Sequence, residues 1–224
     1  VRAAASRGIY TVIDMHQDAF SAFTATPLPA SCPPGTGPAK GWDGAPAWAV
    51  GVAYPDLGII SVALRRGPNV LDPVFTLRHE LAHLALGAAI GPKAPRWLHE
   101  GFAYQHSPEY SRERIETLAG MARFSSTIPL RELDVSFPAD ELPANRAYAE
   151  SYDFVGFLAN RGRWEDRDDD GDRFPFRRFL YELGNGASVD TAAIRAYGRP
   201  ILGLFEEWQQ DLARRYRLMP IGLL

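Results

Sequence analysis

Apolar residues recur at helical spacing in the segment from residue 73 to residue 90. They stand three or four positions apart, which is the pattern of one face of an α-helix: Val74, Leu77, Leu81, Leu84 and Ala88. Asp72 followed by Pro73 is typical of a helix start, and Gly91 before a proline is typical of a helix end. The pattern predicts an amphipathic helix whose apolar side packs inward.

The second half of the chain has the same helical period. It predicts five further helices, which run from about Pro95 to Gln105, Ser111 to Phe124, Ala144 to Asn160, Phe174 to Leu183 and Leu202 to Leu218. The last helix carries a seam at four-residue spacing that should dock on the core: Leu204, Trp208, Leu212 and Tyr216. Trp97 and Trp164 are expected in the core as well. The stretch through Leu130 and Leu133 is expected to be a loop.

Short strands are expected near the N-terminus. Residues 8–14 have the pattern of a buried strand, and residues 27–46 form a loop rich in proline and glycine. Two further strands, Val50 to Tyr54 and Ile59 to Leu64, would be joined by a turn. The fold class predicted from these patterns is α+β, with a small N-terminal β-sheet and a mostly helical C-terminal half.

Composition and charge exclude several classes of protein. With 224 residues, 46% of them hydrophobic and 23% charged, the chain can bury a core and is neither disordered nor fibrous. A net charge of −3 without any basic run gives no reason to expect nucleic acid as a partner. Cys32 is the single cysteine, so a metal ion would have to be held by histidine and carboxylate side chains.

The sequence His79-Glu80-Leu81-Ala82-His83 lies inside the first predicted helix. Residues four positions apart on a helix are offset by about 40°, so His79 and His83 can present two imidazoles to one cation. Glu80 lies beside the pair and can reach a water molecule bound to that cation. The pattern predicts a metal site with a general base next to it.

A third ligand is expected from Glu100, seventeen positions after His83, in the segment from Trp97 to Ala103. Two histidines and one carboxylate form a known catalytic zinc set, which leaves a fourth position for water. We therefore expect one catalytic zinc ion, held by His79, His83 and Glu100. The extended motif with a third histidine is excluded, because Leu86 and Ala89 occupy the positions of its glycine and histidine.

An oxyanion donor is expected on the long helix that begins near Ala144. Tyr148 and Tyr152 stand four residues apart on one of its faces, so spacing alone does not choose between them. The alternative for both tyrosines is plain helix packing. His99 and His106 are expected to lie outside the ligand set, His99 as a neighbour of the ligands or as a surface residue and His106 in solvent.

An acidic segment matches the first positions of a calcium-binding loop. Asp166, Asp168 and Asp170 are followed by Gly171, but the twelfth position is Arg177, where a bidentate glutamate is required. A solvated acidic loop is the interpretation that fits these residues.

From about residue 46 to residue 218 the chain resembles the gluzincin metallopeptidases, in particular their small, minimal branch of peptidase-MA type. The resemblance is carried by the His-Glu-x-x-His sequence at 79–83, by the segment 97–103, and by the helix from Tyr148 to Arg161. It implies a zincin-like fold, catalytic zinc on His79, His83 and Glu100, Glu80 as general base, and a peptide or protein substrate. His99 departs from the pattern, because aminopeptidase relatives have asparagine before the glutamate.

Residues 1–45 resemble a different family, the endoglycoceramidase-type glycoside hydrolases. The likeness is carried by residues 8–18 and 41–46. A segment of this length cannot close a (β/α)₈ barrel, which takes about 250 residues. We therefore expect a junction near residues 45–48, where a hydrolase-like fragment meets the peptidase-like domain. The alternative is an ordinary N-terminal strand of the peptidase domain.

Three segments follow from these patterns: residues 1–45, a peptidase-like domain over 46–218, and an apolar end at 219–224. The predicted function is hydrolysis of peptide bonds by attack of a zinc-bound water assisted by Glu80. The competing hypothesis is a non-catalytic relative that serves as a binding or scaffold domain. The resemblance also implies a bacterial extracytoplasmic or membrane-tethered protein, with membrane association through sequence beyond the C-terminus.

Overall fold

The structure is a computed structural model. It describes residues 10–14, 51–54, 59–63, 65–66, 69–70, 73–91, 94–107, 111–135, 141–160 and 174–216. Several expectations fall outside these residues, namely the cap at Asp72, the core position of Trp164, the acidic loop at 166–171 and the apolar end at 219–224.

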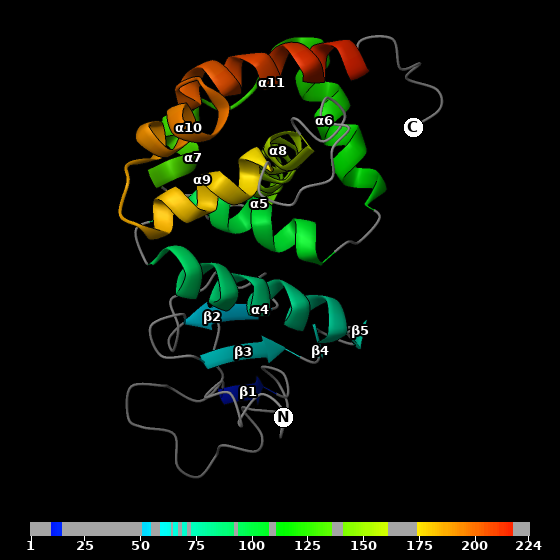
Figure 1. Ribbon diagram of the computed structural model, residues 1–224. Coiled ribbons are helices and arrows are strands. Elements are labelled where there is room, and N and C mark those ends of the chain that lie inside the picture. The colour runs from blue at the N-terminus through cyan, green and yellow to red at the C-terminus, as the bar shows by residue number, and fades with distance from the viewer. Residues whose placement is uncertain are drawn as a thin grey trace. The chain divides into compact units, whose positions relative to one another are not determined.

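The chain divides into two compact units, residues 1–85 and 86–224, and the division falls inside a helix. The first unit contains β1 (Tyr10–Asp14), β2 (Gly51–Tyr54), β3 (Ile59–Ala63), β4 (Arg65–Arg66), β5 (Asn69–Val70) and most of α4 (Pro73–Ile90) (Figure 1). The second unit contains α5 (Arg96–His106), α6 (Arg112–Phe124), α7 (Leu130–Val135), α8 (Glu141–Asn160), α9 (Pro175–Gly184), α10 (Val189–Tyr197) and α11 (Ile201–Tyr216).

The strands of the first unit are short. Three of them pair in the order β1-β3-β2, with β1 parallel and β2 antiparallel to β3. Tyr10 and Tyr54 both stand beside Ile59 in this register. The predicted junction near residues 45–48 would be tested by the burial of the β1 side chains. The structure does not describe that burial, so the junction stays a prediction.

Helix α4 packs on β3 through a small apolar cluster. Leu84 is buried together with Ile60 and Val62, and Leu77 and Leu81 lie partly buried against them. The predicted inward stripe is wrong at its two ends, because half of the surface of Val74 is exposed and Ala88 is exposed. The helical period identifies the apolar face of a helix. How much of that face is buried depends on the elements that pack against it.

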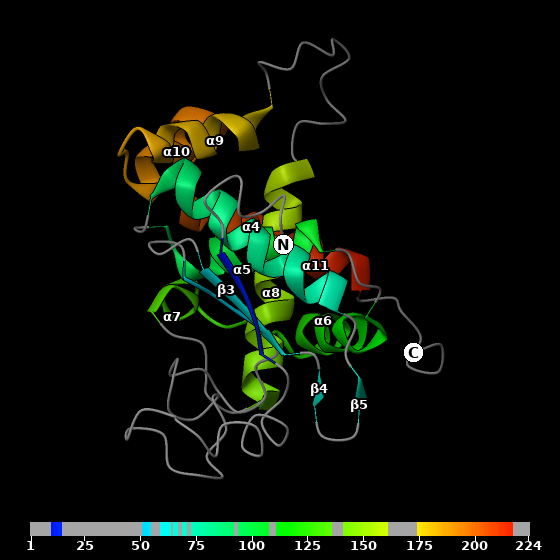
Figure 2. The same ribbon diagram turned by 90° about the horizontal axis from the view of Figure 1, so that it is seen from below.

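The second unit is a group of helices around α8. This helix packs against α5, α6, α9 and α11 (Figure 1). Helices α9 and α10 lie side by side in both ribbon views, and they contact each other extensively (Figure 2). Residues Leu86 and Ile90, at the end of α4, belong to the core of this unit.

An aromatic cluster forms the centre of this core. The ring centroid of Phe154 lies 5.0 Å from that of Trp97, 5.1 Å from that of Phe205 and 5.7 Å from that of Trp208. The indole nitrogen of Trp208 donates a hydrogen bond of 2.8 Å to Asp153. The core positions predicted for Trp97 and Trp208 are confirmed, and so is the inward seam of α11 at Leu204, Trp208 and Leu212.

Glycine allows α5 and α8 to approach closely. A Cβ atom at Gly101 would overlap the carbonyl oxygen of Ser151 and a methyl group of Val155. The contact fixes α5 against the middle of α8, because only a residue without a side chain fits there. Trp97 and Leu98, on the first turn of α5, are buried in the core beside it.

The predicted fold class, α+β with an N-terminal β-sheet, is wrong. The part of the chain that the structure describes is overwhelmingly helical, and it does not form a sheet-based domain. The short strands of the first unit contribute few residues compared with the helices. Short apolar runs and a turn in the sequence indicated strands, but they could not show that the helices would supply the larger core cluster.

Two elements of the second unit differ from the sequence predictions. The stretch through Leu130 and Leu133 is not a loop but the short helix α7, in which both leucines are buried. Helix α10 was not predicted; Ser188 caps its start, accepting a hydrogen bond from the backbone of Thr191, and Gly198 ends it at φ 74°. Both helices are short, and short helices depend on tertiary packing more than on local pattern.

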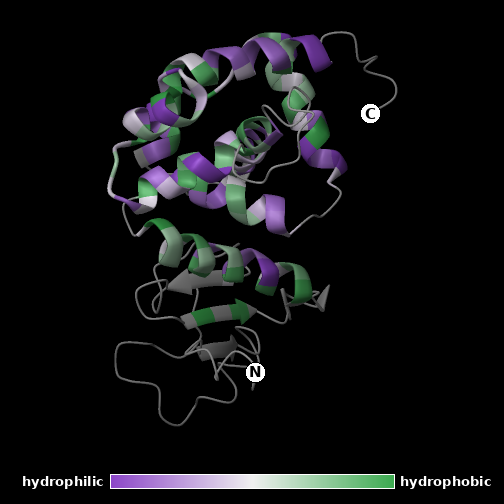
Figure 3. Cartoon of the chain, in the orientation of Figure 1, coloured by the Kyte–Doolittle hydropathy of each residue, from purple (hydrophilic) through white to green (hydrophobic). Residues whose placement is uncertain are grey.

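Hydropathy differs between α4 and α11. Figure 3 shows α4 as largely hydrophobic, whereas hydrophilic residues run along α11. Within the described part of the chain, no helix combines the length and the apolar character that crossing a membrane requires.

Candidate metal centre

The two histidines of the motif point their ring nitrogens at each other. His79 and His83 lie on α4, and their Nε2 atoms are 3.1 Å apart. Two zinc–nitrogen bonds of 2.0–2.1 Å at a tetrahedral angle would separate the nitrogens by roughly 3.3 Å. The rings are nearly perpendicular, with an interplanar angle of 83°. The pair therefore has the spacing of two ligands to one ion.

Glu100 joins this pair. His79, His83 and Glu100 each offer one ligand atom, and these atoms all lie within 4.8 Å of one another. Two imidazoles and one carboxylate match a catalytic zinc site in which a further position stays open. The group therefore could bind a metal ion, as the sequence spacing predicted.

Glu80 lies against the start of β2. Its side chain is 5% exposed, and a Cβ atom added at Gly51 would stand 2.5 Å from Glu80 Oε1 and 2.6 Å from a methyl group of Thr76. Glycine at this position leaves room for the carboxylate. A buried carboxylate next to two histidines is a suitable general base for a water molecule at this place.

Glu100 stands on α5 next to the helix contact described above. Gly101 faces α8, so Glu100 is turned about 100° from that contact and stays partly exposed. Burial lowers the pKa of its neighbour His99, and the charge of Glu100 opposes this effect. His99 is partly buried, whereas His106 is exposed, as predicted. The Nδ1 atom of His106 lies 2.9 Å from the carbonyl oxygen of Phe102.

The two candidate tyrosines have different surroundings. Tyr148 packs edge-on against Tyr104, with ring centroids 5.5 Å apart. Tyr152 lies under the guanidinium of Arg114, which is 4.4 Å from its ring centroid. Tyr104 follows Glu100 by four residues and so shares its face of α5. Tyr148 is therefore the candidate that contacts the side of α5 that carries Glu100.

Glu150, between the two tyrosines, is a fully buried carboxyl group. Its Oε2 accepts a hydrogen bond of 3.0 Å from the backbone of Ile128, while Oε1 has no hydrogen-bond partner within the described structure. Burial raises the pKa of Glu150 to about 8; the bond from Ile128 and the charge of Arg146 only partly offset it. The carboxyl is therefore mostly protonated at neutral pH.

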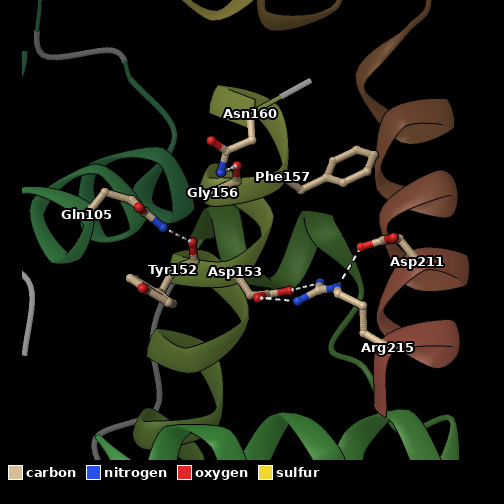
Figure 4. A pocket seen from close by; sticks show the side chains of 8 residues that line it. All are labelled: Gln105, Tyr152, Asp153, Gly156, Phe157, Asn160, Asp211 and Arg215. Carbon is tan, nitrogen blue, oxygen red and sulfur yellow. Dashed lines mark hydrogen bonds and ion pairs between the residues drawn. The ribbon is translucent and has the colours of Figure 1, made fainter. Parts of the chain in front are cut away.

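A separate pocket of about 480 Å³ lies in the second unit, among α5, α8 and α11. Figure 4 shows Gln105 and Tyr152 on one side, and Asp153 with Arg215 and Asp211 on the other. The amide nitrogen of Gln105 donates a 2.8 Å hydrogen bond to the carbonyl oxygen of Tyr152. Arg215 binds both oxygens of Asp153, so the charges of this pocket are engaged in joining α11 to α8.

Sequence reasoning missed the residues that support this centre. Gly51 and Gly101 had no recognisable signal except that each glycine interrupts a regular element. Tyr104 had a readable signal, since it stands one helical turn after Glu100. Arg114 had none, because it comes from a helix that the motif does not include.

Comparison with known families gives one match. The model of the family described as Peptidase MA superfamily matches residues 44–214. The resemblance of residues 1–45 to glycoside hydrolases finds no support in this comparison, and neither does the narrower gluzincin assignment. Neither the search of curated proteins nor that of solved structures finds a match. Because the family model covers well over half of the chain, including the three candidate ligands, this protein belongs to the peptidase MA superfamily.

Proposed function

We propose that this chain is a zinc-dependent metallopeptidase that hydrolyses peptide bonds in a peptide or protein substrate. Membership of the peptidase MA superfamily supports a peptidase. The observation that carries the proposal is the group of His79, His83 and Glu100, whose ligand atoms lie within 4.8 Å of one another. These three residues would hold one catalytic ion, and the 3.1 Å spacing of the two histidine nitrogens fits it.

When bound there, zinc would polarise the peptide carbonyl and make a water molecule more acidic. Glu80 would take the proton from the attacking water and pass it to the amine that leaves. The carboxylate is 5% exposed and lies against Gly51, so it is held in one place and little bulk water competes for it. A fixed base near the reacting atoms is what such a proton transfer needs.

A hydrogen-bond donor for the developing oxyanion completes the proposal. We assign this role to Tyr148 ahead of Tyr152, because the ring of Tyr148 contacts Tyr104 on the face of α5 that carries Glu100. Tyr148→Phe should lower kcat by about 10²-fold or more and leave zinc content unchanged. Tyr152→Phe, four residues away on the same helix, is the matched comparison. An equal loss in both variants would contradict the preference.

The experiment that tests the proposal compares wild type with Glu80→Gln. Both proteins are loaded with zinc, their metal content is measured, and casein cleavage is followed. We expect one zinc per chain in both proteins and a loss of activity by about 10²–10⁴-fold in the variant, since the substitution removes the base but no ligand. Wild type and variant that bind zinc but are equally inactive would favour the non-catalytic scaffold instead.

A further inference from the structure

The linker between α6 and α7, residues 125–129, is attached to two other helices by side chains. Arg146, on α8, donates a hydrogen bond to the carbonyl oxygen of Ser126. The side-chain amide of Gln209, on α11, donates a hydrogen bond of 2.7 Å to the hydroxyl oxygen of Thr127. Every residue of the linker is exposed or only partly buried. Its position therefore depends on such bonds more than on apolar packing.

A third attachment comes from Glu150, on α8. Its Oε2 accepts a hydrogen bond of 3.0 Å from the backbone nitrogen of Ile128. The side chain is 0% exposed, and within the described residues its Oε1 has no hydrogen-bond partner. A neutral carboxyl group can stay in such a place, but a carboxylate needs more hydrogen bonds than this one. The proton on Glu150 therefore affects how well the linker fits against α8.

Within the described structure, Arg146 is the charged group that acts on Glu150. Its charge and the bond from Ile128 both favour the carboxylate, but burial outweighs them and raises the pKa of Glu150 to about 8. Thr127 and Gln209, from the linker and from α11, do not titrate. The charged residues of the other helices packed on α8 are engaged elsewhere: Glu113 of α6 with Asn145, Arg215 of α11 with Asp153, Glu182 of α9 with Arg195 of α10, and Glu100 of α5 in the candidate metal centre.

The linker leads into α7, so its attachment also positions that helix. Leu130 and Leu133 of α7 are buried, and α7 packs against α5, the helix that carries Glu100. The backbone nitrogen of Leu133 donates a hydrogen bond to the carbonyl oxygen of Pro129, the last residue of the linker. A helix as short as α7 depends on such tertiary support. Release of the linker should therefore loosen α7 and leave the longer helices folded.

We propose that Glu150 and the linker 125–129 form a proton-dependent latch: the neutral carboxyl group keeps the linker closed on α8, and ionisation opens it so that water reaches the carboxylate. In the closed state the pKa is about 8, whereas in the open state the exposed group ionises near its ordinary value of 4.5. Between these values closing takes up a proton, so opening becomes about tenfold more favourable per pH unit. The latch does not depend on the proposed peptidase activity.

The test is amide hydrogen exchange of the full chain, followed by NMR from about pH 5.5 to about pH 7.5. Rates are expressed as protection factors, so that the intrinsic effect of pH on exchange cancels. Ile128 and Leu133 report on the latch. Phe179, in the middle of α9 and 0% exposed, reports on the core. Each series is repeated in urea below the unfolding transition, because exchange through a local opening exposes little surface and is insensitive to urea.

Three variants accompany wild type. Glu150→Gln removes the titrating group, Glu132→Gln removes an exposed carboxylate on α7 as the matched control, and Gln209→Ala removes an attachment that does not titrate. Circular dichroism and thermal unfolding establish that the variants are folded. The wild-type series tests the latch by itself if Glu150→Gln does not fold.

In wild type the protection factor of Ile128 should fall by about 70-fold over this pH range, at every urea concentration. Leu133 should follow it. In Glu150→Gln the protection of Ile128 should change by less than about 3-fold, and Glu132→Gln should keep the full fall. Gln209→Ala should lower the protection by about 2–10-fold at each pH and leave the pH dependence unchanged, because it removes one neutral hydrogen bond.

A protection factor at Ile128 that does not depend on pH in wild type would overturn the inference, and so would a dependence that persists in Glu150→Gln. The latch is also refuted if Ile128 is as well protected as Phe179 and loses protection in urea to the same extent. Exchange at Ile128 would then require unfolding of the whole domain, and no separate opening of the linker would exist.

Discussion

Helices α4 and α5 supply the candidate ligands in two different ways. On α4 the spacing of His79 and His83 along one helix is enough to bring their nitrogens to 3.1 Å. On α5 the position of Glu100 depends on contacts distant in sequence, above all on Gly101 against the backbone of Ser151. The first arrangement is local and should tolerate changes elsewhere in the chain. The second should fail when the packing of α5 on α8 is disturbed.

The largest expected effect comes from removing a local ligand. His83→Ala leaves one imidazole in the centre, so activity should disappear. Losing a residue that only hydrogen-bonds to a ligand lowers metal affinity by about 10–100-fold, and losing the ligand itself should lower zinc affinity by more than that. Metal content after gel filtration measures this. His106→Ala, which removes an exposed histidine, should bind one zinc as wild type does. Stoichiometric zinc in His83→Ala would show that the helix spacing does not define the centre.

The next effect concerns Glu150, inside α8. Its pKa rises from about 4.5 in the unfolded chain to about 8 in the fold, so the folded protein binds the extra proton between these values. Protonation of Glu150 in the fold therefore contributes to the free energy of unfolding in full below pH 4.5, and this contribution is lost as pH rises through 8. Glu150→Gln keeps an acceptor for Ile128 and should stabilise the fold by on the order of 3 kcal/mol at pH 7.

Urea unfolding of chelator-treated protein between pH 5 and pH 9 measures this difference. The advantage of Glu150→Gln should grow with pH, whereas Glu132→Gln, at an exposed position on α7, should track wild type. A variant whose advantage does not change over this range would mean that Glu150 is ionised in the fold.

A methyl group at the helix contact tests the tertiary arrangement directly. Gly101→Ala places a Cβ against the backbone of Ser151 and should destabilise the fold by roughly 1–3 kcal/mol, with weaker zinc binding through Glu100. Gly120→Ala, on α6 with no atom within 4 Å of the new Cβ, should stabilise the fold by about 0.5–1 kcal/mol. Thermal unfolding compares the two; similar shifts would contradict a tight contact at Gly101.

The smallest effect is expected next to the base. Gly51→Ala would bring a Cβ to 2.5 Å from Glu80 Oε1, so the carboxylate must move while the three ligands stay in place. We expect unchanged zinc content and a kcat lowered by about 10-fold, because misplacing a catalytic group by a fraction of an ångström raises the barrier. Steady-state kinetics and metal analysis separate the two quantities. Loss of zinc would show that Gly51 supports the ligands instead.

Sequence reasoning worked where the signal was local. The helices at 73–90, 111–124 and 202–218 were predicted to within a few residues, because each has a regular apolar period and clear end signals. It failed where packing decided. The fold class was wrong, the stretch at 130–135 was expected to be a loop, and α10 was missed, since each depends on contacts that periodicity does not contain.

The sequence by itself determined the chemistry of the candidate centre. Its residues are two histidines one helical turn apart and a glutamate seventeen residues on as ligands, with a second glutamate between the histidines as the base. Only the tertiary structure decided what surrounds them: Gly101 against α8, Glu80 against Gly51, and Arg114 held by Tyr104 and Tyr152. The reason is physical, because helical spacing is fixed by bond geometry within a few residues, whereas close approach between elements is fixed by side-chain volume across the whole fold.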